Sequence, residues 1–253
     1  SPTPPTDVER PKKSLLSTIL TRPEVGSLAA AFVIFFFFFA IADPFRTLPA
    51  LSTVLYASSS IGIIAVGVAL LMIGGEFDLS AGVSVVTGAL TASMFAYQFS
   101  LNLWVGVFIS LIVMLAIGFW NGYLVVKTGI PSFLITLSTF FMLAGINLGV
   151  TKLVTGTVAT QNVSDMDGFA SAQALFASEF AVGGVTIRIT VLWWIFFVAL
   201  ATWILLRTRL GNWIFAVGGN AASARAVGVP VDKVKIGLFM GVAFVCWFYG
   251  MHI

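Results

Sequence analysis

The chain has 253 residues, of which 59% are hydrophobic and only 9% are charged. Soluble domains carry about a quarter charged residues, so this composition excludes an ordinary soluble domain and indicates a protein of the lipid bilayer. The net charge of +3 does not indicate a nucleic-acid partner, because the basic residues are scattered between apolar runs, as in cytoplasmic membrane loops. The single cysteine, Cys246, leaves no Cys-x-x-Cys pattern, and no metal site is predicted.

The first stretch, residues 1–22, is polar and rich in Pro, and predicts a disordered cytoplasmic tail. A helix needs about 20 apolar residues to cross the hydrocarbon core of a bilayer. Residues 23–253 contain seven such runs and predict one transmembrane domain, an all-α polytopic helical bundle. The spans are predicted at Val25–Ala42, Leu55–Ile73, Gly82–Tyr97, Leu103–Val126, Phe133–Val150 and Ile189–Leu206, with a seventh that begins near Ile236. We expect this seventh span to be truncated and the domain to be incomplete at its C-terminal end.

The distribution of Lys and Arg orients these spans. With a cytoplasmic N-terminus and one crossing per span, ten basic residues fall inside the cell and three fall outside. The internal residues are Arg10, Lys12, Lys13, Arg22, Lys127, Arg207, Arg209, Arg225, Lys233 and Lys235, and the external residues are Arg46, Lys152 and Arg188. This asymmetry predicts an external loop over residues 151–188, where 170–180 could form a short surface helix, and a cytoplasmic loop over residues 207–235.

The cytoplasmic loop carries the pattern of a short helix with a defined start and end. Gly218–Gly219 break the chain, and Asn220 can cap the next segment by accepting a hydrogen bond from a free backbone N–H. Residues 221–227 are rich in Ala and favour about two helical turns. Gly228 can adopt the left-handed conformation that ends a helix, and Pro230 prevents its continuation. On spacing alone, an ordinary surface helix and a docking helix remain equally compatible with this pattern.

A second motif, residues 73–82, separates the second and third spans. It contains Glu76 and Asp78, two carboxylates close to the membrane, where acidic residues are costly and often functional. The local interpretation is that Gly74–Gly75 ends one helix and that Asp78 or Ser80 caps the next. Both interpretations can hold together.

Several polar residues within the spans could line a path for a solute. More often, hydroxyl and amide groups in membrane helices bond to their own helix or to a neighbour, so both interpretations stay open. The candidates for path lining are Ser58, Ser59, Ser60, Thr87, Asn121, Ser132 and Thr136.

Three motifs resemble one known family. The segment 213–229 resembles the coupling loop of permease subunits in the ribose-type, binding-protein-dependent branch of bacterial ABC importers. The Gly-Gly…Asp-Leu-Ser-x-Gly motif that ends at Gly82, and the Pro-Ser-Phe segment that starts at Pro131, are similar to further signatures of that family. Ala81 stands where Val is common, which is a mild departure. The resemblance covers most of Leu55–Gly241.

The resemblance implies a multi-pass permease subunit of a bacterial inner membrane that forms the translocation path for a simple sugar. It implies a second permease copy as a homodimer partner, cytoplasmic ATP-binding subunits and a periplasmic substrate-binding protein. The short helix would dock in the ATPase. The chain has no P-loop motif, so it would not be an enzyme and would bind no cofactor itself, with ATP and Mg bound by the partner ATPase. The candidate coupling residues are Gly218, Gly219, Asn220, Ala224, Arg225 and Gly228.

Two alternatives stay open. A permease of the same superfamily could carry branched-chain amino acids or nucleosides. A self-sufficient secondary transporter commonly needs ionisable residues or broken helices within the membrane, and only Glu76 and Asp78 could serve. An intramembrane enzyme is disfavoured, because the sequence contains no His-Glu-x-x-His or Gly-x-Ser-x-Gly motif.

Overall fold

A computed structural model of the chain describes residues 23–99 and 102–253. The predicted tail over residues 1–22, with four of the basic residues used for orientation, lies outside the described residues. The chain divides into two compact units, one that ends at Leu51 and one that begins at Ser52.

The first unit contains helix α2 (Pro23–Ile41) and the short 3₁₀ helix η1 (Asp43–Arg46). Within α2 the run 35–39 consists of five phenylalanines, each between 44% and 60% exposed. A helix that is apolar on all sides is suited to lipid and not to water. Arg46 ends the helix, since its guanidinium donates hydrogen bonds to the carbonyls of Phe39 and Ala40. A basic side chain at a helix C-terminus satisfies carbonyls that have no partner within the helix.

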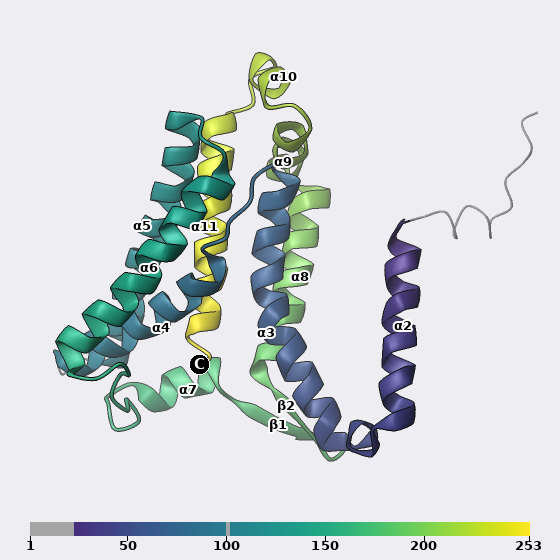
Figure 1. Ribbon diagram of the computed structural model, residues 1–253, viewed down its shortest axis with the longest axis vertical. Coiled ribbons are helices and arrows are strands. Elements are labelled where there is room, and N and C mark those ends of the chain that lie inside the picture. Colours follow the sequence, from purple (N-terminus) through teal and green to yellow (C-terminus); the bar gives the residue numbers. More distant parts are fainter. Residues whose placement is uncertain (1–22, 100–101) are drawn as a thin grey trace, which may run out of the picture. The chain divides into compact units, whose positions relative to one another are not determined.

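The second unit is helical apart from one short hairpin (Figure 1). Its helices are α3 (Leu48–Ile73, from Ser52 onward), α4 (Ala81–Gln98), α5 (Leu103–Thr128), α6 (Ser132–Thr155), α7 (Phe169–Phe176), α8 (Ile189–Arg207), α9 (Arg209–Gly219), α10 (Ala221–Ala226) and α11 (Val231–Gly250). The antiparallel strands β1 (Glu179–Val182) and β2 (Val185–Arg188) lie between α7 and α8.

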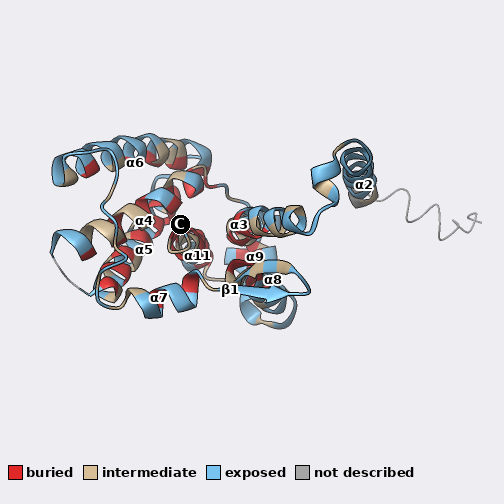
Figure 2. Ribbon diagram, turned by 90° about the horizontal axis from the view of Figure 1, so that it is seen from below, coloured by how far each residue is buried: buried red, intermediate tan, exposed pale blue. Residues whose placement is uncertain are grey.

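Helix α11 lies at the centre of the second unit and packs against α4 and α5. Figure 2 shows buried residues where these three helices meet. Glycines on α5 permit the close approach: a Cβ at Gly118 would lie 2.7 Å from the Cβ of Ala243, and a Cβ at Gly122 would lie 2.7 Å from the Cα of Ile236. Small residues at such interfaces let membrane helices pack backbone to backbone.

Four helices of the described chain, α3, α5, α6 and α8, are long and apolar enough to cross a membrane. The helical membrane class is therefore confirmed. Helices α2, α4 and α11 coincide with the other three predicted spans but do not meet the same criterion. Both α4 and α11 have many buried residues, and a helix covered by protein instead of lipid needs less apolar surface. The count of seven spans stays a prediction.

Three local features differ from the prediction. Helix α11 begins at Val231 and not near Ile236, with Pro230 at its N-cap position. Most of the loop 207–235 is helical, since α9 begins directly after Thr208, whose hydroxyl accepts a hydrogen bond from the Gly211 amide at 3.2 Å. The segment 151–188 contains the predicted short helix, as α7, but also the hairpin β1–β2, which was not predicted.

Candidate functional site

The loop between α3 and α4, residues 74–80, begins with the predicted helix end. Gly75 has a φ of +85°, a left-handed conformation that favours glycine. The amides of Gly75 and Glu76 return to the carbonyls of Met72 and Leu71 at 3.0 and 3.2 Å. These bonds satisfy carbonyls at the end of α3 and turn the chain sharply towards α4.

The prediction that Asp78 or Ser80 caps α4 is wrong. Ser80 occupies the N-cap position, but its side chain makes no capping bond. Its hydroxyl donates to Asp78 Oδ1 at 2.6 Å instead, and its amide donates to the same oxygen at 2.8 Å. Asp78 is only 6% exposed, and this burial raises the pKa of its carboxyl while the two bonds from Ser80 oppose the change. The carboxylate therefore stabilises the loop and not the helix terminus.

A buried chain of hydrogen bonds connects this loop to α5 and α6. Asn121 on α5 donates through Nδ2 to the hydroxyl of Ser80 at 3.2 Å. The hydroxyl of Thr139 on α6 donates to Asn121 Oδ1 at 2.6 Å. Both ends of the Asn121 amide are therefore used, and three segments distant in sequence are joined.

The backbone of the loop is held by α6 as well. The amide of Phe77 donates to Ser132 Oγ at 3.1 Å, and the amide of Leu79 donates to Thr136 Oγ1 at 3.1 Å. Because a loop has few internal partners for its own amides, these two hydroxyls fix its path over the start of α6. Ser132 lies directly after Pro131, which occupies the N-cap position of α6.

The candidates for path lining mostly have hydrogen-bond partners within the bundle. Asn121, Ser132 and Thr136 hold the loop 74–80, as described above. Ser59 and Ser60 are buried and donate to the Tyr56 carbonyl at 2.8 Å each, while Ser58 is exposed. Thr87 donates to the Val83 carbonyl at 3.0 Å and accepts from Asn147 at 3.0 Å. These contacts match the second interpretation, in which polar side chains bond to their own helix or to a neighbour. A role of these residues in a solute path stays a prediction.

Helix α10 has the predicted caps. Asn220 Oδ1 accepts from the Ser223 amide at 2.9 Å, and Gly228 has a φ of +88°. Ala224 is buried, whereas Arg225 is exposed and forms an ion pair with Asp232 on the first turn of α11. The result is a short, well-delimited helix that protrudes at one end of the second unit, which we call the α10 end (Figure 1).

The two glycine pairs meet at the α10 end. A Cβ on Gly218, in the last turn of α9, would lie 1.8 Å from the carbonyl oxygen of Ile73, where α3 ends. A Cβ on Gly75 would lie 3.4 Å from Gly218 Cα. The end of α9 therefore contacts the start of the loop 74–80 without an intervening side chain. Gly219 and Gly82 take no part in this contact, since a Cβ at either would meet nothing within 4 Å.

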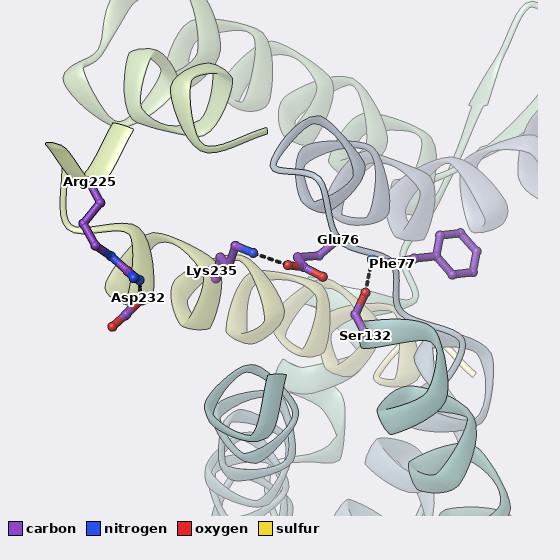
Figure 3. A network of polar contacts seen from close by, with 6 residues as sticks. All are labelled: Glu76, Phe77, Ser132, Arg225, Asp232 and Lys235. Carbon is purple, nitrogen blue, oxygen red and sulfur yellow. Dashed lines mark hydrogen bonds and ion pairs between the residues drawn. The ribbon is translucent and has the colours of Figure 1, made fainter. Parts of the chain in front are cut away.

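The structure adds one residue that sequence reasoning missed as part of the site. Lys235 Nζ donates to Glu76 Oε1, so that α11 is joined to the loop 74–80 (Figure 3). The side chains are 21% and 10% exposed, respectively. In the sequence Lys235 served only as an orientation signal, and its separation of 159 residues from Glu76 gave no sign of the pairing.

These features define the class of the protein. It is a polytopic helical membrane protein in which α9 and α11, on either side of the protruding helix α10, both contact the loop 74–80. Comparison of the sequence agrees with this class. Residues 50–253 match the family described as the branched-chain amino acid transport system / permease component, and the chain belongs to this family. No solved structure is significantly similar to the chain.

Named relatives confirm the predicted likeness to ribose-type permeases. The chain is 33% identical over 215 residues to the ribose import permease protein RbsC of Escherichia coli, covering 84% of this chain and 63% of that protein. It is 28% identical to the autoinducer 2 import system permease protein LsrC of Enterobacter sp., over 87% of this chain and 60% of the relative. It is 31% identical to the xylose/arabinose import permease protein XylH of Sulfolobus acidocaldarius, over 74% and 49%. The chain thus spans less than two thirds of the length of these relatives.

Proposed function

We propose that the chain is the permease subunit of an ABC importer and forms the translocation path for a simple sugar in a bacterial inner membrane. The observation that carries the proposal is the direct contact of α9, at Gly218, with the end of α3 at Ile73. This contact joins the segment that carries the protruding α10 directly to the end of α3, as a helix needs if it is to transmit movement from a docked ATPase. Family membership and the sugar import named for several relatives support the same function.

In this proposal the chain crosses the membrane seven times, with its N-terminus and its α10 end in the cytoplasm. Within the second unit, the C-terminal ends of α3, α5 and α8 and the N-terminal ends of α6 and α11 lie toward the α10 end, whereas α4 begins deeper in the bundle (Figure 1). Basic residues at the α10 end are Lys127, Arg207, Arg209, Arg225, Lys233 and Lys235, and at the other end they are Lys152 and Arg188. This excess agrees with the preference of Lys and Arg for cytoplasmic loops.

The partners follow from this orientation. The helix α10 docks on cytoplasmic ATP-binding subunits, which bind ATP and Mg, while a second permease copy completes the path. A periplasmic binding protein delivers the solute to the opposite end, where α7 and the hairpin β1–β2 lie. Nucleotide shifts the balance between inward-open and outward-open states only by its different affinity for the two. The permease therefore supplies the two-state element, and its partners supply the energy.

The absence of charge inside the spans favours a neutral solute. In α3, α4, α5, α6, α8 and α11, charged residues occur only near helix ends. A sugar is recognised by hydrogen-bonding groups and aromatic faces and needs no fixed charge. The family description favours branched-chain amino acids as a second candidate, but a zwitterion would leave two charges without partners in such a path.

A secondary transporter working alone fits the described residues less well. Its ion coupling would depend on Glu76 and Asp78, the two carboxylates of the loop 74–80. Each has a partner already, because Glu76 pairs with Lys235 and Asp78 accepts two hydrogen bonds from Ser80. Neither is thus placed to exchange an ion along a path.

Co-purification tests the docking role of α10. Combining Arg225→Glu with Gly228→Pro reverses an exposed charge and removes a left-handed turn that Pro cannot adopt. We expect the variant to lose its ATPase subunits while it keeps the thermal stability of the membrane domain. Lys233→Glu, which reverses a charge on the exposed side of α11, is the control and should retain them. Unchanged assembly of the double variant would contradict docking through α10.

A further inference from the structure

Two ion pairs follow one another along the segment from α10 to the loop 74–80 (Figure 3). Arg225 on α10 pairs with Asp232 on the first turn of α11, and Lys235, one turn further on, pairs with Glu76. The two pairs differ in exposure: the side chains of the first are 65% and 56% exposed, and those of the second are 21% and 10% exposed. Exposed pairs contribute little, whereas removing one partner of a shielded pair leaves a charge without compensation.

Beyond Glu76 the connection continues into the bundle. The amide of the next residue, Phe77, donates to Ser132 Oγ at 3.1 Å, and two residues later Leu79 donates to Thr136 Oγ1 at 3.1 Å. A displacement of Glu76 is therefore passed through the backbone to the start of α6. The loop has little room to move on its opposite side, because the backbone at Gly75 is in contact with Gly218.

The loop 74–80 is thus held between two elements that flank α10 in the sequence. On one side the end of α9 contacts it through Gly218, and on the other side α11 contacts it through Lys235. The contact with α11 depends on Glu76, whose side chain is largely shielded from solvent in its pair with Lys235. The other carboxyl of the loop, Asp78, accepts hydrogen bonds from Ser80.

We propose that Glu76 and Lys235 are positioning residues that transmit movement of the ATPase-docking helix to the loop 74–80 and from there to α6. This inference rests on the proposed function as an ABC permease. In this role the two residues act on each other and need no contact with solute or nucleotide. Their pairing makes the loop follow α11 when α10 is displaced, so that hydrolysis in the partner is converted into movement of α6.

Uptake per ATP hydrolysed tests the pair. The complete complex is reconstituted in vesicles, and radiolabelled ribose uptake and phosphate release are measured in parallel for Glu76→Gln and Lys235→Met. Each variant should keep its ATPase subunits and its basal hydrolysis, and should lose about tenfold in ribose taken up per ATP, within the range of typical coupling between sites. Exchange of the charges, Glu76→Lys with Lys235→Glu, should restore most of the ratio, which a general loss of folding would not allow.

The matched control is Lys233→Met, which removes a charge from the exposed side of the same helix, where Lys233 has no ion pair with any described residue. It should leave the ratio unchanged. Single variants that transport as well as the parent protein, or a charge exchange no better than the single changes, would overturn the positioning role alone. Parent protein that takes up solute without ATP would overturn the proposed function, and the positioning role with it.

Discussion

The contact between α9 and α3 predicts a large effect of the smallest possible substitution, Gly218→Ala. The added Cβ would lie 1.8 Å from the Ile73 carbonyl oxygen, and real Cβ atoms essentially never approach closer than 3.0 Å. The backbones must therefore separate by about 1.2 Å or distort, because the obstructing atom is a backbone oxygen and not the end of a flexible side chain. Overpacking of this kind costs about 1–3 kcal/mol, and we expect a lower free energy of unfolding and a lower melting temperature in detergent.

The neighbouring residue provides the control. Gly219→Ala makes the same chemical change one position further along α9, where the Cβ meets nothing within 4 Å. Ala favours a helix over Gly by up to about 1 kcal/mol at either position, so the difference between the two variants isolates the contact with Ile73. Equal melting temperatures for the two variants would refute the reasoning. Gly218→Ala should also lower ATP-dependent uptake, whereas Gly219→Ala should not.

Two further predictions concern the loop 74–80. Asn121→Ala removes the amide that bonds to Ser80 and Thr139 and leaves their buried hydroxyls without this partner, so it should cost about 1–3 kcal/mol of stability, measured by thermal unfolding. The control is Asn212→Ala at an exposed position, which should cost less than about 0.5 kcal/mol. Equal effects of the two variants would contradict the role of Asn121 in holding the loop to α5 and α6. Burial raises the pKa of Asp78 above its ordinary value of 3.8, so the folded protein holds this proton more tightly than the unfolded chain, and stability should fall as pH rises from 3.8 through the raised pKa. Asp78→Asn should lose that part of the pH dependence, and parallel curves of melting temperature against pH for the two proteins would contradict the assignment.

Local patterns predicted the helices and the ends of α10 well, for physical reasons. Long apolar runs such as Leu103–Val126 leave few alternatives to a helix in a membrane, because backbone groups must be satisfied within the segment. The end of α10 depends on Asn220 and Gly228, whose capping roles come from their own side chains and backbone freedom. The structure places both residues in these roles.

The wrong predictions concern segments whose local sequence signal was weak, or residues whose side chains bond to tertiary partners instead. The hairpin β1–β2 is joined by Gly183–Gly184, both with positive φ, which is a known hairpin signal, but its strands have only four residues each. Serine is a typical cap residue and Ser80 occupies the N-cap position, but its hydroxyl bonds to Asp78 and Asn121 instead of the helix.

Tertiary partners were beyond the reach of sequence patterns. Glu76 and Lys235 are separated by 159 residues, and nothing in their local surroundings distinguishes Lys235 from Lys233. Their spatial relation depends on the packing of α11 against the neighbouring helices. Gly74–Gly75 was interpreted as a helix end and Gly218–Gly219 as a break in the chain, and only the fold shows that Gly75 and Gly218 lie at the same contact.

The central claim is that this chain transports only when driven by separate ATP-binding subunits. The most direct test is solute uptake into vesicles that contain the permease, with the ATPase subunits and the binding protein added or omitted in turn. We predict accumulation of a simple sugar that requires ATP on the ATPase side and stops when either partner is left out. Accumulation that follows an ion gradient in the absence of the ATPase would contradict the account.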